Sequence, residues 1–322
     1  MNSKNKFFRL SMYLIASLLI FASSCKKDTP EPVIDHYKVM TDYMVANSMD
    51  LPDVLTSWTI SATDLNTSLA DYYVIDLRSA TDFATGHIEG AHNTTLANVL
   101  TEAGNANGKP IVMVCYTGQK AAHAHVALRL SGYTDCKILL FGMSSWNAEF
   151  DSWTANIGDV AVGHTNWSTT NTTQTPVTFT VPEITSTETT GDKILKERVD
   201  VMLAGDFQGV AIDPVLTTPS DYFINNYWTA ADIDTYGHIK TAYRIKEDLS
   251  LAKDGFKYLD KDATIVTYCW TSQTSSAITA YLTILGYPNV KSLKFGANGM
   301  IYSELQAHKW TASGDFNYVT SK

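Results

Sequence analysis

Two cysteines in this chain of 322 residues stand where a nucleophile would be expected. Each follows a run rich in apolar residues, such as Ile111–Val114 before Cys115, and each precedes a segment with helical periodicity. A continuous apolar run is typical of a buried parallel strand. A cysteine between a strand end and a helix start lies among unpaired backbone N–H groups and near the positive end of the helix dipole. Both effects favour the thiolate, so we expect Cys115 and Cys269 to have lowered pKa values and to act as nucleophiles.

The loop that begins at Cys115 has the sequence CYTGQK. Gly118 supplies the backbone freedom that this loop needs to curl around the sulfur with its N–H groups turned inward. Lys120 adds a positive charge at the rim. This arrangement suits attack on an anionic sulfur donor, after which the loop would hold a persulfide anion. The residues expected to bind the substrate are Tyr116, Thr117, Gly118, Gln119 and Lys120.

The segments around the two cysteines are copies of one another. The interval from Cys115 to Gly132 equals that from Cys269 to Gly286, and a glycine-tyrosine pair stands at both places. Further upstream, GHIEGA in the first half corresponds to GHIKTA in the second. Agreement in order and spacing indicates a duplicated domain.

Each copy alternates apolar strand-like runs with helical segments. In the first copy, Tyr72–Ser79 is another expected strand, and a short strand and a turn at Gly142 follow the helix. This alternation predicts an α/β fold with two domains, each a mostly parallel sheet with helices on both faces. Ligands of such sheets bind beyond the carboxyl ends of the strands, where both cysteines are expected.

Four features of the first copy together resemble the rhodanese family: the six-residue loop that opens with Cys115, the D-x-R triplet Asp76–Arg78, the GHIEGA stretch and the later FGMSSW. The resemblance implies a thiosulfate sulfurtransferase-like enzyme with a thiosulfate-type donor, a persulfide on Cys115 and a thiol or cyanide acceptor. It also implies that Arg78 helps to bind the substrate. Lys120 stands where an arginine is common, which keeps the charge but loses the bidentate fork. We expect neither a cofactor nor a metal ion.

The second copy departs further from this pattern. Its loop, CWTSQT, has Ser272 in the glycine position and no charged residue. Its strand is expected at 209–213, where Asp213 precedes a proline and no D-x-R arginine follows, and an insertion is expected before Gly237. We therefore assign the main activity to Cys115 and consider Cys269 either a second nucleophile or an idle thiol in a structural domain.

Two other kinds of function stay open from the residues alone. The protein could accept or bind sulfur compounds without efficient turnover, as a carrier or binding module. It could also be a thiol-redox sensor, because an activated thiolate is readily oxidised.

We expect several other cysteine, histidine and aspartate residues to have structural roles rather than catalytic ones. Cys136 aligns with Val290 and is expected in the core. His87 recurs in the second copy at a turn far from the cysteine and is expected to be hydrogen-bonded. Asp76 is expected to secure its loop or to pair with Arg78. His123 and His125 are two apart on a helix, a spacing that does not favour a metal site.

The first residues predict export. Lys4, Lys6 and Arg9 precede the apolar run 10–22, which is too short to span a membrane but typical of a signal peptide. Small residues then lead into Cys25, in a pattern that resembles the lipobox of bacterial lipoproteins. We expect cleavage of a signal peptide (1–24), lipid attachment at Cys25 and a tether (25–35). The sign of the following residues favours the outer membrane, with the protein facing the periplasm or the cell surface.

Composition sets the remaining limits. The chain is long enough for two cores, and 45% hydrophobic with 18% charged residues fits globular domains. The net charge of −9 argues against nucleic acid as a partner. Beyond residue 25, no run approaches the length of a membrane-spanning helix, so the lipid would be the only membrane contact. We expect domain 1 at 36–160, a polar linker at 161–180 and domain 2 at 181–322.

Overall fold

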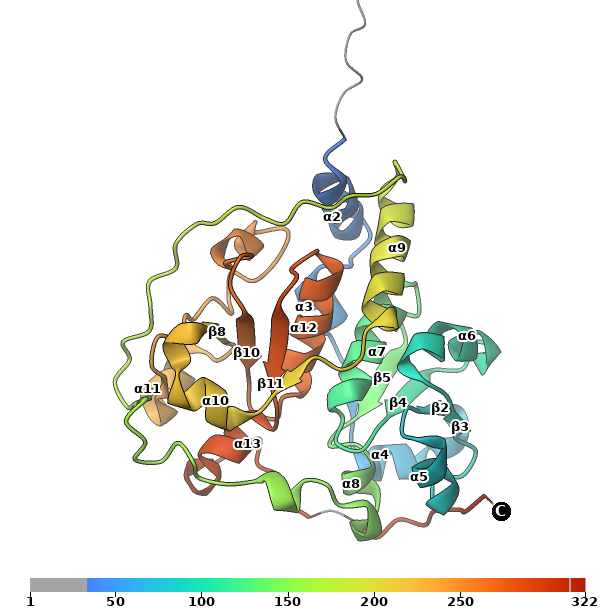
Figure 1. The fold of residues 1–322 in the computed structure, drawn as a ribbon. Coiled ribbons are helices and arrows are strands. Elements are labelled where there is room, and N and C mark those ends of the chain that lie inside the picture. Colours follow the sequence, from blue (N-terminus) through green and yellow to red (C-terminus); the bar gives the residue numbers. More distant parts are fainter. Residues whose placement is uncertain (1–33, 313, 322) are drawn as a thin grey trace, which may run out of the picture. The chain divides into compact units, whose positions relative to one another are not determined.

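Two parallel sheets, one in each half of the chain, form the framework of the computed structural model, which describes residues 34–312 and 314–321 (Figure 1). From Asp35 onward, the described residues form one compact unit. The predicted signal peptide, Cys25 and nearly all of the predicted tether lie outside the described residues.

The first sheet has five parallel strands in the order β1-β5-β4-β2-β3. Its strands are β1 (Thr59–Ile60), β2 (Tyr73–Asp76), β3 (His92–Asn93), β4 (Ile111–Val114) and β5 (Cys136–Leu139). Its helices are α4 (Ala62–Thr67), α5 (Ala80–Thr85), α6 (Val99–Ala103), α7 (Gln119–Leu130) and α8 (Met143–Trp146). Side chains of β4 alternate between two cores: Ile111 and Met113 face the core that holds α6 and α7, and Val112 and Val114 face the core that holds α4 and α8.

The second sheet repeats this plan with four parallel strands in the order β7-β11-β10-β8. Its strands are β7 (Gly209–Val210), β8 (Phe223–Asn226), β10 (Ile265–Tyr268) and β11 (Val290–Leu293). Its helices are α9 (Gly191–Ala204), α10 (Ile212–Thr217), α11 (Ala230–Tyr236), α12 (Gln273–Ile284) and α13 (Gly296–Met300), and the remaining helices, α2 (His36–Ala46) and α3 (Leu51–Val54), precede the first sheet. The predicted α/β fold with helices on both faces of each sheet is confirmed.

The predicted insertion in the second copy is wrong. Strand β8 lies inside it and pairs with β10 as β2 pairs with β4, so that Asn226 opposite Tyr268 corresponds to Asp76 opposite Val114. The segment 209–213, taken as that strand, instead forms the short edge strand β7 and then enters α10. Asparagine is depleted in strands, and for this reason the buried FINN of β8 resembled a loop.

The two helices that follow the cysteines, α7 and α12, pack against each other between the two sheets (Figure 1). Ten of the twelve residues of α7 are buried, and so are ten of twelve in α12. Both helices carry buried alanines, such as Ala124 and Ala280, and these small side chains belong to the same core. One hydrophobic core therefore contains residues from both halves of the chain.

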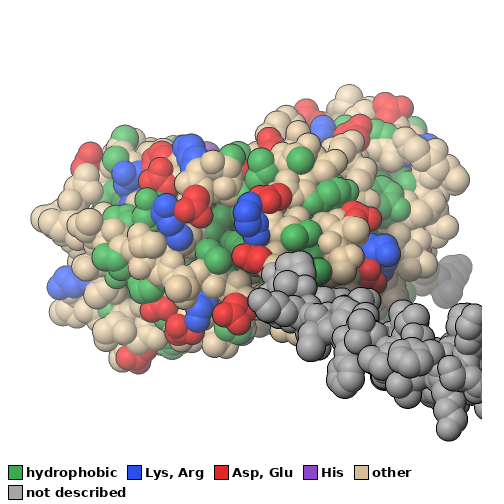
Figure 2. All heavy atoms as spheres, turned by 90° about the horizontal axis from the view of Figure 1, so that it is seen from above, with side chains coloured by type: hydrophobic (Ala, Val, Ile, Leu, Met, Phe, Trp, Pro, Cys, Tyr) green, Lys and Arg blue, Asp and Glu red, His purple; other side chains and the backbone are tan. Residues whose placement is uncertain are grey.

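The predicted linker contains a strand of its own, β6 (Trp167–Ser168), which pairs antiparallel with β9 (His238–Ile239). On the face drawn in Figure 2, acidic and basic side chains are interspersed. Among the described helices, none is long and apolar enough to cross a membrane.

Candidate active site

Cys115 lies directly after β4, and Gly118 begins the turn into α7. Gly118 has φ of +81°, a left-handed conformation that glycine adopts at little cost. A Cβ at this position would also lie 2.3 Å from Nε2 of Gln273, so this flexible side chain would have to move to admit one. The predicted curl of the loop is confirmed.

The loop turns its N–H groups toward the sulfur. Gly118 N–H and Ala121 N–H donate to Sγ of Cys115 at 3.1 and 3.4 Å. The backbone carbonyls are bound elsewhere: that of Cys115 accepts from Met143 N–H (2.8 Å), and that of Tyr116 accepts from the hydroxyl of Ser144 (2.8 Å). The carbonyls are therefore fixed on the outside, while the sulfur lies in a cradle of donors.

The predicted lowering of the Cys115 pKa is wrong for this structure. The residue is only 1% exposed, and burial raises the pKa of its thiol above the usual value. Backbone N–H groups, first among them that of Ala121, lower the pKa but do not offset the burial. Burial thus disfavours the thiolate in the closed loop, while the N–H donors around Sγ would stabilise an anion that forms there.

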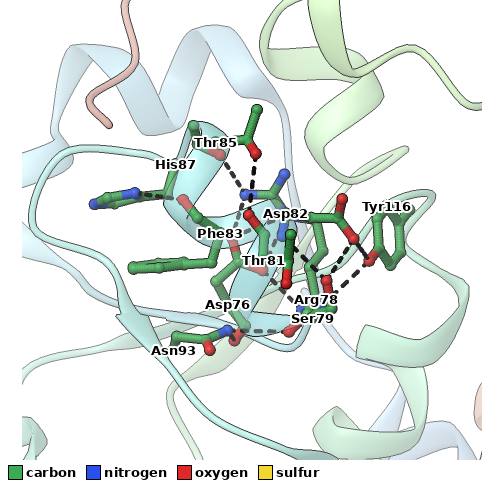
Figure 3. A network of polar contacts seen from close by, with 11 residues as sticks. Asp76, Arg78, Ser79, Thr81, Asp82, Phe83, Thr85, His87, Asn93 and Tyr116 are labelled. Carbon is green, nitrogen blue, oxygen red and sulfur yellow. Dashed lines mark hydrogen bonds and ion pairs between the residues drawn. The ribbon is translucent and has the colours of Figure 1, made fainter. Parts of the chain in front are cut away.

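Arg78 is buried beside this loop and is bound to Asp76. Its Nη2 donates to Oδ2 of Asp76 and to the carbonyl of Gly86, both at 2.7 Å (Figure 3). Its guanidinium also lies against the rings of Phe150 and Tyr116, with centroid distances of 5.3 and 6.0 Å. The predicted pairing of Asp76 with Arg78 is confirmed, and substrate binding by Arg78 stays a prediction.

The side chain of Lys120 forms an ion pair with a residue of the second domain. Its Nζ lies 2.8 Å from Oδ1 of Asp206, and this contact lowers the pKa of the Asp206 carboxyl. Lys120 and Arg78, the two cations predicted to attract an anionic donor, are thus both paired with carboxylates. Attraction of an anionic donor by Lys120 stays a prediction, and such a donor would have to share the Lys120 charge with Asp206.

Two other loop residues that were predicted to bind the substrate, Tyr116 and Thr117, make hydrogen bonds within the protein. Tyr116 donates through its hydroxyl to Asp82 and accepts from Ser79 N–H (3.2 Å; Figure 3). The carbonyl of Thr117 accepts from Nε2 of Gln273 (3.1 Å) and from Nε1 of Trp153 (3.2 Å). Gln119, in contrast, is buried, and its Nε2 has no hydrogen-bond partner among the residues that the structure describes.

A pocket of about 290 Å³ opens beside Tyr116. Its lining combines three aromatic rings, one buried cation and three acidic side chains, and consists of Arg78, Asp82, Thr85, Tyr116, Glu149, Phe150, Asp151, Ser152 and Tyr318. Sequence reasoning missed Gln273 and Tyr318, which reach this loop and pocket from the second half of the chain. The duplicated Gln119 and Gln273 could have drawn attention to the first of them.

The second loop has the same backbone shape but different surroundings. Ser272 adopts φ of +65°, so serine does take the conformation of Gly118, and its hydroxyl is bound to that of Ser292 (2.8 Å). Cys269 is 2% exposed, and its sulfur accepts from Ser275 N–H (3.4 Å). The cradle of donors is thus sparser than at Cys115.

Aromatic side chains fill the region that corresponds to the pocket of domain 1. By strand register, Trp228 holds the place of Arg78, and it is fully buried. Trp270, which corresponds to Tyr116, stacks on Trp228 at 4.4 Å and on His308 at 5.2 Å. Both cysteines are buried, but a pocket opens beside the first loop, whereas aromatic rings occupy the corresponding place beside the second, and this difference favours Cys115 as the reactive thiol.

Two structural interpretations from the sequence are confirmed. Cys136 is buried, its Sγ lies 3.5 Å from Nδ1 of His125, and burial raises its pKa to about 12. His87 Nδ1 lies 2.8 Å from the carbonyl of Phe83 (Figure 3). Within residues 34–312 and 314–321, no cluster of three or more potential metal ligands occurs.

Comparison with known proteins agrees with this duplicated arrangement. The profile of the rhodanese-like domain matches residues 61–149 and 205–301. The chain belongs to the rhodanese-like family. The matched ranges lie inside the two domains expected at 36–160 and 181–322.

Relatives of this rhodanese-like chain include two thiosulfate sulfurtransferases named GlpE. That of Shewanella oneidensis is 35% identical over 75 residues, which is 23% of this chain and 74% of the relative. That of Pseudomonas putida is 34% identical over 83 residues, 26% of this chain and 76% of the relative.

Solved structures with similarity include the 3-mercaptopyruvate sulfotransferase SseA of Escherichia coli. It has 17% identity and a TM-score of 0.28, over 74% of this chain and 98% of SseA. A rhodanese-related protein of Thermoplasma volcanium has 23% identity and a TM-score of 0.26, over 28% of this chain and 89% of its own.

Proposed function

We propose that this protein is a sulfurtransferase that moves sulfane sulfur from a thiosulfate-like donor to a thiol or cyanide acceptor through a persulfide on Cys115. The observation that carries the proposal is the inward orientation of the loop N–H groups at Sγ of Cys115, beside an open pocket. Such a cradle suits an anion that forms on the sulfur during reaction. The GlpE relatives, which are thiosulfate sulfurtransferases by name, agree with the same chemistry.

The reaction balances in two steps. The Cys115 thiol loses its proton to solvent, and the thiolate attacks the outer sulfur of thiosulfate. A sulfur–sulfur bond forms, the bond within thiosulfate breaks, and sulfite leaves with the bonding electrons, so that Cys115 carries a persulfide anion. The acceptor then attacks the terminal sulfur, and the Cys115 thiolate is the leaving group.

Mass spectrometry tests this proposal directly. After incubation with thiosulfate and removal of the excess, the full chain should gain the mass of one sulfur atom, and peptide mapping should place it on Cys115. The raised pKa of Cys115 means that uptake should accelerate as pH increases, because the thiolate fraction increases over the range in which the protein stays folded.

The same experiment separates the alternative functions. A sulfur atom that is taken up but not passed to cyanide or a thiol would indicate a carrier. A gain of oxygen instead of sulfur, after treatment with peroxide, would favour a redox sensor. Absence of any sulfur on Cys115 at every pH would contradict the proposal.

We also propose that the protein is exported and anchored through a lipid on Cys25. Cys25→Ser should then block processing or release the protein from membranes, because the acyl chains supply the membrane affinity. Fractionation of cells that express each form measures this. Membrane association and processing equal to wild type would contradict lipid attachment at this residue.

A further inference from the structure

The C-terminal arm, defined here as residues 314–321, belongs by sequence to domain 2 but lies against domain 1 (Figure 1). Phe316 N–H donates to the carbonyl of Trp146 (3.1 Å), whose Nε1 donates to the carbonyl of Asn317 (2.8 Å). Val319 and His87 exchange two backbone hydrogen bonds of 2.9 Å. The arm is thus fixed to domain 1 at both ends of its described length.

The segment that follows domain 1 lies on domain 2 in the same manner. Ala161 N–H donates to the carbonyl of Met300 (2.9 Å), which stands at the same interval from Gly296 as Trp146 from Gly142. Strand β6 then pairs with His238 of β9, the counterpart of His87. The two domains therefore exchange their carboxyl-terminal extensions, and the C-terminal arm is one half of this exchange.

The arm brings Tyr318 into the wall of the pocket beside Tyr116. Cys115 lies one residue before Tyr116 and is buried behind the lining of this pocket rather than being part of it. The ring of Tyr318 meets that of Phe150 edge to face at 4.8 Å, and both line the pocket with Tyr116. Gly86, the first residue of GHIEGA, leaves room for these rings: its φ is 176°, but a Cβ there would lie 2.5 Å from Phe150 and 2.7 Å from Tyr318. Gly86, in the motif that the two copies share, thus lacks a side chain where the C-terminal arm packs against domain 1.

We propose that Tyr318 is a specificity-determining residue that limits the size of the sulfur compound able to reach Cys115. The pocket volume of about 290 Å³ lies at the lower end for small-molecule sites, and Tyr318 supplies one of its three aromatic walls. The wild-type pocket selects compact sulfur donors and acceptors. This inference rests on the proposed function only for the identity of the compounds, since access to Cys115 can be measured without sulfur transfer.

Alkylation of the full-length protein tests the inference. The rates at which Cys115 reacts with a small reagent, iodoacetamide, and a bulky one, fluorescein maleimide, are measured by peptide mass mapping. Tyr318→Ala should raise the ratio of the bulky to the small rate by about tenfold, because the wall that opposes the larger reagent is removed. The matched control is Val319→Ala: Val319 is 36% exposed against 38% for Tyr318, lies next to it in the arm and does not line the pocket. This control should leave the ratio at its wild-type value.

Two further variants keep the result decisive. Tyr318→Phe retains the ring and should match wild type, and Tyr318→Leu should give an intermediate ratio even if the alanine variant does not fold. An unchanged ratio in folded Tyr318→Leu and Tyr318→Ala would overturn the inference. An equal acceleration of both reagents, also seen in Val319→Ala, would overturn it too, because it would show that the arm affects only stability. A changed ratio in a protein that takes up no sulfur would leave the inference standing and the proposed function refuted.

Discussion

Replacement of Cys115 by serine is expected to lower kcat/KM for sulfur transfer from thiosulfate to cyanide by about three orders of magnitude or more. The hydroxyl keeps the shape of the thiol but is a poor nucleophile, and the persulfide can no longer form. Steady-state assay of thiocyanate production measures the effect. Far-ultraviolet circular dichroism and a thermal melt check that the loop variant is folded.

The matched control is Cys269→Ser, the same substitution at the equivalent position of domain 2. Stacked rings of Trp228 and Trp270 stand where domain 1 has Arg78 and Tyr116 at its pocket, so we expect activity within about twofold of wild type. The opposite outcome, with activity lost in Cys269→Ser and retained in Cys115→Ser, would move the active site to domain 2. Equal partial losses would show that both domains turn over.

The sequence was sufficient to predict where Cys115 lies in the fold. Strand β4 covers Ile111–Val114 as the apolar run predicts, and the glycine at position 118 takes the left-handed conformation expected of it. These features depend on local chemistry, namely the residues a buried strand requires and the backbone angles that glycine accepts. For this reason they could be inferred from a few adjacent residues.

Strand β8 could not be recognised in the same way. Its residues Asn225 and Asn226 are polar, yet both are fully buried, and the Asn225 amide lies 3.3 Å from the hydroxyl of Thr267 on the neighbouring strand. Tertiary context here overrides the low strand preference of asparagine. The missed strand also hid the correspondence between Arg78 and Trp228.

The electrostatics of the site depended on groups distant in the sequence. Lys120 meets Asp206, and burial exceeds the effect of the N–H donors on the pKa of Cys115. Helix position alone suggested a free cation and a lowered pKa. The ion-pair partner of Lys120 and the burial of Cys115 depend on how α7 packs against domain 2. Local sequence patterns do not reveal this packing.

Substitution of Gly142 by alanine is expected to have the largest effect on stability among the loop variants. Gly142 has φ of +64°, and a Cβ there would lie 2.4 Å from the carbonyl oxygen of Cys115 and 2.7 Å from the backbone nitrogens of Thr117 and Gly118. These neighbours are backbone atoms of the Cys115 loop, which cannot yield without displacing the donors that surround Sγ. We expect the free energy of unfolding to decrease by about 3 kcal/mol or more, from strain and overlap together.

Gly132→Ala separates these two causes. Gly132 also has a positive φ, +94°, but within the described part of the chain no atom lies within 4 Å of the position that its Cβ would take. In Gly132→Ala the free energy of unfolding should therefore decrease by only about 1 kcal/mol, because the variant loses only the conformational advantage of glycine. Urea unfolding measures both variants, and thiosulfate uptake under folding conditions should decrease more than about tenfold in Gly142→Ala alone. Equal stability losses, with uptake unchanged in both variants, would show that the close approach of Gly142 to the loop is not needed to hold the cradle around Cys115.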